Sequence, residues 1–109
     1  MTAIVPAEHV QLDYAAIKRA AMILRAINHK KINQPILKLL NENKSMMVTD
    51  IYSNLRLEQS VASQHLAVLR RANIVIGERK SREIYYSLNH KRIAEVADFL
   101  DKFSPAPDA

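Results

Sequence analysis

The stretch SVASQHLAVLRR, residues 60–71, decides how this chain folds. On a helical wheel at about 100° per residue, its apolar side chains gather on one side and its polar side chains on the other. His65 falls inside the apolar sector, so we expect it to point at the rest of the protein and to be buried and hydrogen-bonded. The stretch therefore predicts a helix with one face on the protein core. The apolar side holds Val61, Ala62, Leu66, Val68, Leu69 and Ala72.

The opposite side of this helix begins with small and amide side chains and ends with two arginines. A helix that only faces solvent more often carries Glu and Lys there. Small side chains allow a helix to enter the major groove of DNA, where Gln64 can pair with adenine and Ala67 can touch a thymine methyl group. Taken alone, an ordinary amphipathic surface helix explains the pattern equally well. The outward set, our candidate DNA-reading face, is Gln59, Ser60, Ser63, Gln64, Ala67, Arg70 and Arg71.

The segment before residue 60 predicts a second helix close to the first. In MMVTDIYSNL, residues 46–55, Thr49 is placed to cap a short helix that runs through Leu55. RLEQ then makes a tight turn, Ser60 begins the quoted helix, and that helix runs to about Asn73. Two helices joined by four residues, the second starting in small polar side chains, are typical of a helix-turn-helix.

After the quoted helix the period changes to two. In IVIGERKSREIYYSL, residues 74–88, apolar residues alternate on either side of a basic tip, which predicts a β-hairpin. We expect Arg79, Lys80 and Arg82 at the tip to reach phosphates or a minor groove, although a charged tip is often only solvated. The expected inward residues are Ile74 and Ile76 before the tip and Ile84, Tyr86 and Leu88 after it.

Helices are also predicted at both ends of the chain. From about Glu8 to Ile27 the apolar residues recur every three or four positions, which is one helix face. A second helix ends around residues 41–43, and Pro35 leaves its start open, either near Asn33 or near Asn28 with a bend. Asn89 is placed to cap a last helix with an apolar face of its own. These last apolar residues are Ile93, Val96, Ala97, Leu100 and Phe103.

Composition limits the class of protein. The 109 residues make one domain, 49% apolar, with one glycine and four prolines, so we expect a mostly α fold with a small β-hairpin. We expect residues 1–7 and 104–109 to be disordered tails and residues 8–103 to form the domain. The lack of cysteine excludes disulfides, thiolate metal ligands and a thiol nucleophile. No apolar run approaches a membrane span and no secretory signal is evident, which favours a cytoplasmic protein.

The charge is unevenly placed. Residues 56–82 hold six Lys/Arg against two Glu, a net of +4, whereas residues 83–109 hold three against five, a net of −2, in a chain of +5 overall. A basic centre favours a polyanion partner such as DNA. A basic chain that is merely soluble is the alternative.

These residues together resemble a known family. The run Leu-x-x-Ser-x-x-Ser-x-His-Leu-x-x-Leu, starting at Leu57, and the basic hairpin closing on Tyr-Tyr-x-Leu resemble the ArsR/SmtB-type winged-helix transcriptional regulators. INHKKINQPILKLL, residues 27–40, resembles the second helix of that family. The similarity covers roughly residues 10–103. It implies a winged helix-turn-helix of about five helices plus a wing.

The resemblance also implies partners. It implies a homodimer joined by the first and last helices, which binds an inverted-repeat operator in double-stranded DNA and represses by covering a promoter. The sequence departs from the family's metal sensors, since the third helix has no cysteine and the last helix offers His90, Glu95 and Asp98 without a second histidine three residues from the first. We therefore expect no metal and no cofactor, and the inducer stays unknown. The implied dimer contacts are Leu12, Ala16, Ala20, Ile23, Ile93, Val96, Leu100 and Phe103.

Two other functions compete with DNA binding. A winged helix can instead contact an acidic protein through its basic face. An enzyme is disfavoured, because Ser63 and His65 are two apart and point away from each other on a helix, and no glycine-rich phosphate loop is present.

Overall fold

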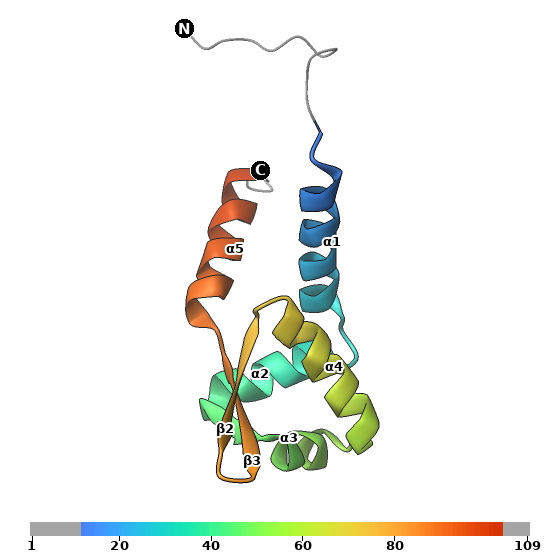
Figure 1. Ribbon diagram of the computed structural model, residues 1–109, viewed down its shortest axis with the longest axis vertical. Helices are drawn as coiled ribbons and strands as arrows, with labels where there is room; N and C mark the ends of the chain where they lie inside the picture. The colour runs from blue at the N-terminus through green and yellow to red at the C-terminus, as the bar shows by residue number, and fades with distance from the viewer. Residues whose placement is uncertain (1–11, 104–109) are drawn as a thin grey trace, which may run out of the picture.

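The computed structural model describes residues 12–103, which form five helices and a three-stranded antiparallel sheet (Figure 1). The prediction of a mostly α fold with a small hairpin is confirmed. The predicted tails, residues 1–7 and 104–109, lie outside the described residues. In chain order the elements are α1 Tyr14–Asn28, α2 Asn33–Asn43, β1 Ser45–Met47, α3 Val48–Leu55, α4 Gln59–Arg71, β2 Val75–Lys80, β3 Glu83–Leu88 and α5 His90–Phe103.

The molecule has two distinct ends. Figure 1 shows α1 and α5 standing as separate arms at one end, while α3 and the tip of the β2–β3 hairpin lie at the other. The core lies between these ends, and its largest fully buried side chains come from α2, α3, α4 and the start of β2. Each such side chain contributes about 1.5–3 kcal/mol by leaving water. They are Ile36, Leu40, Ile51, Leu66, Leu69, Ile74 and Val75.

Helix α1 begins later than its apolar pattern predicts. Residues 8–11 of the helix expected from about Glu8 lie outside the described residues; within the described chain α1 starts at Tyr14, and Leu12, expected on its apolar face, precedes it and is 56% exposed. The reason is a cap: the Asp13 carboxylate accepts a hydrogen bond from the Ala16 N–H at 3.0 Å. A side-chain cap satisfies a first-turn donor and fixes an extended backbone at its own position, which ends the helix there.

The start of α2 settles the question that Pro35 leaves open in the sequence. Helix α1 ends at Asn28, His29 is extended, and α2 begins at Asn33. Pro35 is therefore the third residue of α2, within the first turn, where the missing N–H is no loss.

The approach to α3 differs from the prediction. Thr49 does not cap this helix, because α3 begins one residue earlier, at Val48, with no side-chain cap. The preceding residues form a third strand that the sequence did not predict: β1 pairs with β3, Met46 opposite Tyr86. The chain therefore enters the helix directly from a strand. Three residues are too few for an alternation to be recognised.

The predicted recognition helix is present with small changes at its ends. It spans Gln59–Arg71 where the pattern predicts residues 60–73. It ends early because Asn73 adopts a left-handed backbone, φ 62°, and the Ile74 N–H bonds back to the Leu69 carbonyl at 2.9 Å. Asparagine tolerates this conformation at helix ends better than most residues.

The hairpin is confirmed, with one side chain on the unexpected face. Tyr86 and Leu88 are buried as predicted, and Ile84 is half-buried, but Ile76 is 46% exposed. Val75 lies opposite Leu88 in the pairing and takes the inward position instead. Ile74 is buried because it precedes the strand, in the turn that leaves α4. The alternation of inward and outward side chains therefore begins at Val75, one residue later than the sequence predicted.

The inward face of α4 gives a stability prediction. Replacing Leu66, which is fully buried, with alanine is expected to lower the free energy of unfolding by about 2–5 kcal/mol, measured by urea denaturation. The control is Ser63→Ala on the exposed face of the same helix, expected to change it by less than about 0.5 kcal/mol. Equal effects of the two substitutions would show that α4 does not pack as described.

Candidate nucleic-acid interface

The two faces of α4 are separated as the wheel predicts. Ala62, Leu66 and Leu69 are fully buried against the core. Ala67 is half-buried at the border of the two faces. The predicted contacts of these outward residues with DNA stay a prediction. The exposed members of the candidate reading face are Gln59, Ser60, Ser63, Gln64, Arg70 and Arg71.

A basic residue lies in the turn that joins α3 to α4. Arg56 is exposed and adopts a left-handed backbone, φ 55°, as the C-cap of α3. The backbone of the next residue is hydrogen-bonded to α3, since the Leu57 N–H donates to the Tyr52 carbonyl at 2.9 Å. The sequence analysis counted Arg56 in the basic segment but did not place it in the interface. Its position in the predicted four-residue turn directly before the recognition helix was the available signal.

The hairpin presents its basic residues at the tip. Arg79, Lys80 and Arg82 are all exposed, and the Lys80 Nζ lies 5.3 Å from the centroid of the Tyr85 ring. Such a cation–π contact limits the directions that a long, flexible lysine explores. The tip lies at the α3 end of the molecule, away from the α1 and α5 arms (Figure 1). The wing and the turn before α4 thus share one end.

Arg70 lies against the hairpin. A Cβ atom placed on Gly77 of β2 would come within 3.2 Å of the Tyr86 Cε1 and 3.5 Å of the Arg70 Cζ and Nε. Gly77, the only glycine of the chain, therefore lies directly beside the Arg70 guanidinium, between α4 and the hairpin. Arg70, predicted from the wheel as a phosphate contact, is also the bridge between the last turn of α4 and the wing.

His65 turns toward the scaffold as predicted, although it is half-buried rather than fully buried. Its Nδ1 lies 3.0 Å from the Asn33 Oδ1, and its ring centroid is 4.8 Å from that of His29. Burial, and then the charge of His29, lower the pKa of His65. A neutral imidazole is therefore favoured at this position.

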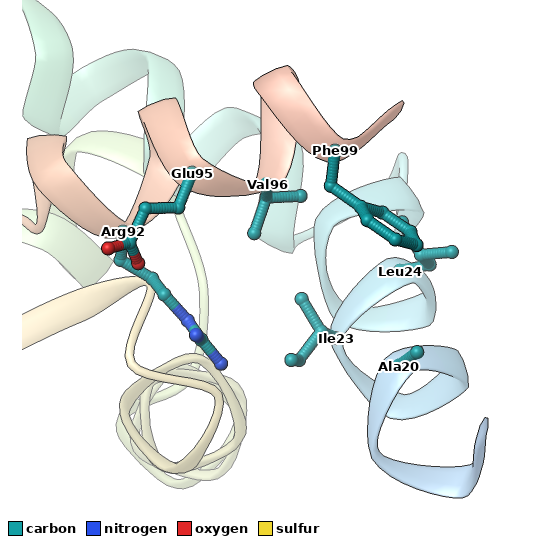
Figure 2. Close-up of a pocket in the computed structure, with 7 residues that line it drawn as sticks. All are labelled: Ala20, Ile23, Leu24, Arg92, Glu95, Val96 and Phe99. Carbon is teal, nitrogen blue, oxygen red and sulfur yellow. The ribbon is translucent and has the colours of Figure 1, made fainter. Parts of the chain in front are cut away.

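The arms enclose an apolar groove of about 240 Å³ between α1 and α5. In Figure 2 the Phe99 ring points across toward Leu24, and Arg92 and Glu95 lie near the other end. The Arg92 Nε donates to the Ala72 carbonyl at 3.3 Å, which fastens the base of α5 to the end of α4. The Asn89 Oδ1 accepts from the Arg92 N–H at 3.1 Å, so the predicted cap of α5 is confirmed.

The predicted dimer residues are spread along both arms. Leu12 is exposed, Phe103 is the last residue of α5, and the other six are half-buried. The structure adds more exposed apolar side chains on α1, with Tyr14, Ile17 and Leu24 at 72%, 52% and 38% exposure. The half-buried predicted residues are Ala16, Ala20, Ile23, Ile93, Val96 and Leu100.

Metal ligands do not gather in the part of the chain that the structure describes: no three His, Cys, Asp or Glu side chains converge there. Asp98, one of the acids considered on the last helix, pairs instead with Lys102 at 3.3 Å. Within residues 12–103, no helix combines the length and apolar character that a membrane crossing needs.

Known proteins share this sequence and fold. Residues 35–76, from the first turn of α2 into β2, match the model of the bacterial regulatory protein, arsR family. The transcriptional repressor PagR of Bacillus anthracis is 30% identical over 84% of this chain and 90% of its own. The transcriptional activator HlyU of Vibrio cholerae is 30% identical over 77% and 76%. The crystal structure of NolR from Sinorhizobium fredii superposes with a TM-score of 0.65 at 28% identity, covering 97% of this chain and 99% of that one.

The matched region contains the features already described: the two helices of the helix-turn-helix, the turn of three residues, 56–58, between them and the first residues of the wing. The likeness to PagR and NolR extends over most of the chain, so it also includes the arms. On the family match, the relatives and the fold together, the chain belongs to the ArsR family of bacterial regulatory proteins and is a winged-helix, DNA-binding transcriptional regulator.

Proposed function

We propose that this protein is a homodimeric transcriptional repressor that binds an inverted-repeat operator through α4 and the wing. One observation carries the proposal: the uncharged first half of the α4 outward face is exposed, and basic side chains flank it from the adjoining turn and the hairpin tip. That arrangement suits a duplex, because base edges need small polar readers in the major groove and the phosphates beside them need cations.

Within this proposal the side chains divide by chemistry. Gln64 reads a base edge, with Ser60 and Ser63 beside it, because an amide can hold adenine N6 and N7 at once. Arg56, Arg79 and Arg82 contact phosphates, where charge rather than shape is needed. Arg71 lies one turn further along α4 from Ala67 and extends the basic edge.

The homodimer is proposed from the arms. Ile17 and Leu24 are apolar and exposed on α1, and α5 supplies a facing apolar side across the groove. A second copy covering these surfaces would remove them from water, which is the usual driving force of such interfaces. In a two-fold dimer the recognition helices would lie about 34 Å apart, one turn of DNA, so the operator would be an inverted repeat.

Repression is proposed over activation because PagR, which covers more of this chain than HlyU does, is named as a repressor. A dimer that covers a promoter blocks transcription without further contacts. The proposal includes no catalytic step, and it places the protein in the compartment that holds the DNA, the cytoplasm of a bacterial cell.

Binding to the DNA upstream of its own gene, titrated at several salt concentrations beside a scrambled duplex, tests the proposal directly. We expect tight, selective binding that weakens steeply as salt rises, and reduced transcription from that promoter when the protein is added. Equal weak binding to both duplexes would contradict an operator-binding role and point to a protein partner. Selective binding with increased transcription would make the protein an activator.

Replacing Gln64 with alanine is expected to weaken operator binding by about 1–3 kcal/mol and to relax base choice at one position in each half-site. Competition with operators mutated one base at a time measures both effects. The control is Gln34→Ala, which also removes an exposed amide, on α2. It should change neither the operator affinity nor the base choice. An equal loss on every DNA sequence would remove Gln64 from the base-reading set.

Replacing Arg79 with alanine is expected to weaken binding to all duplexes alike and to reduce the slope of log affinity against log salt by about one, because one phosphate contact is lost. Arg19→Ala, an exposed arginine on the α1 arm, should leave the slope unchanged. An unchanged slope in Arg79→Ala would exclude this side chain from the phosphate contacts.

Replacing Ile17 with glutamate is expected to convert dimers to monomers, measured by sedimentation, since a charge would be buried unpaired in the interface. Ile17 is 52% exposed in a single chain, so the fold of the monomer should survive. Lys18→Glu, the next residue along the helix and also exposed, is the matched control and should leave the dimer intact. A dimeric Ile17→Glu would exclude this part of α1 from the interface.

A further inference from the structure

Three polar side chains from different elements meet beneath the recognition helix. His29 follows α1, Asn33 begins α2, and His65 lies in the middle of α4. Asn33 is 2% exposed, the one buried polar or charged side chain among the described residues. The proposed DNA-binding function gives none of the three a role, although one of them belongs to the helix that would read the bases.

The hydrogen bonds fix which atoms carry protons. The Asn33 Nδ2 donates to the Ala26 carbonyl at 2.8 Å, so the Asn33 Oδ1 is the atom that faces His65. An amide oxygen only accepts, and the His65 Nδ1 at 3.0 Å must therefore donate. The neutral His65 then keeps its lone pair on Nε2, where a second proton would be added.

The Nδ1 of His29 acts as an acceptor, in contrast to the Nδ1 of His65, which donates. The His29 Nδ1 accepts from the Ile32 N–H at 3.3 Å, an N–H group at the start of α2 that no helical carbonyl can satisfy. A proton on that Nδ1 would abolish the bond. A proton on either ring would also place charge beside its neighbour, 4.8 Å away between centroids. The His29 bond therefore needs an unprotonated Nδ1, whereas a proton on the His65 Nε2 leaves the bond to Asn33 in place and acts only through its charge.

The surroundings offer little to offset added charge. His29 faces His65 from the loop after α1, the uncharged Asn33 faces it from α2, and Arg71 of α4 lines the same surface hollow as His65. Lys30 and Lys31 follow His29 and are exposed. No carboxylate in the described part of the chain lies within ion-pair distance of either imidazole.

We propose that His65 is a positioning residue that holds the recognition helix on Asn33, and that protonation of His65 at Nε2, which keeps the Nδ1 bond to Asn33 but adds a positive charge beside His29 and Arg71, displaces α4 from its place on the scaffold, so that sequence-selective DNA binding is lost at acid pH. The inference rests on the proposed DNA-binding function. Selectivity depends on this hold because base contacts need side chains placed within a fraction of an ångström, whereas phosphate attraction tolerates a displaced helix. Added positive charge would favour nonspecific binding, so selectivity and total affinity respond in opposite directions.

The shift at His65 has a consequence for stability with a definite sign. Its pKa is lowered in the folded protein by burial and by His29, so the unfolded chain takes up the proton more readily. Stability from this group is present above the ordinary histidine pKa of about 6.5 and is lost as the pH falls through the lowered value. Lowering the pH therefore removes the stability that the neutral His65 contributes to the folded protein.

The test measures the ratio of operator to scrambled-duplex affinity at about pH 7.5 and about pH 5.5, at fixed salt, in the full chain. We expect the ratio to fall several-fold at the lower pH. In His65→Asn, whose amide nitrogen replaces Nδ1 as the donor to Asn33 but takes no proton, the ratio should stay level. In His29→Asn, whose amide oxygen can accept from the Ile32 N–H, the fall should be reduced. His90→Asn, at the exposed start of α5, is the matched control and should behave as the unchanged protein.

The proposal would be overturned if the ratio of operator to scrambled-duplex affinity in the unchanged protein were the same at both pH values. It would also be overturned if the ratio fell as much in His65→Asn as in the unchanged protein. NMR of the same samples supplies a readout that needs no DNA: amide signals across residues 59–71 should shift together with the His65 imidazole titration in the unchanged protein and not in His65→Asn. If no duplex is bound selectively at any pH, the proposed function fails, and these signals still decide whether protonation displaces α4. A stationary α4 would overturn the positioning role. If His65→Asn does not fold, His29→Asn carries the comparison.

Discussion

The packing of α4 on the core is the constraint on which the rest of the structure depends. One helix has to bury an apolar face and leave a polar face accessible, and a period of 3.6 residues allows both only if the two kinds of residue keep their spacing. Leu66 and Leu69 are completely buried, while Ser63 and Gln64, on neighbouring turns, are exposed. A face that reads bases must be held still, and here the rigidity comes from the buried side of the same thirteen residues.

The wing approaches this helix closely at Gly77 of β2. A Cβ atom on Gly77 would be in ordinary contact with the Arg70 guanidinium at 3.5 Å and would require the Tyr86 ring, at 3.2 Å, to shift slightly. Helix α4, proposed to read bases, and the hairpin, proposed to bind phosphates, are thus in direct contact at their bases. Since phosphate contacts fix the register in which base contacts are made, a fixed relation between the two elements matters more than the number of basic residues.

The sequence was sufficient for features that depend on neighbours in the chain. The two faces of α4, the hairpin and the Asn89 cap all follow from local spacing and are present. Features that depend on distant partners were missed. Strand β1 exists only because β3 pairs with it, and the contact of His29 with His65 joins residues 36 positions apart in number. The Asp13 cap shows a third case, in which a single hydrogen bond marks the first residue of α1 at a place that the apolar pattern alone did not identify.

The two ends of the molecule have opposite chemistry, and α4 connects them. The arms are apolar and suit a second copy, whereas the hairpin end is basic and suits a polyanion. In a dimer the distance between two recognition helices depends on how each one is attached to its own arm. That attachment is partly the chain of contacts from the Ala26 carbonyl through Asn33 to His65, which links the last turns of α1 to the middle of α4. Half-sites bound by such dimers lie about one helical turn apart, so in the proposed dimer the contacts of Asn33 would help to set which half-site spacing fits.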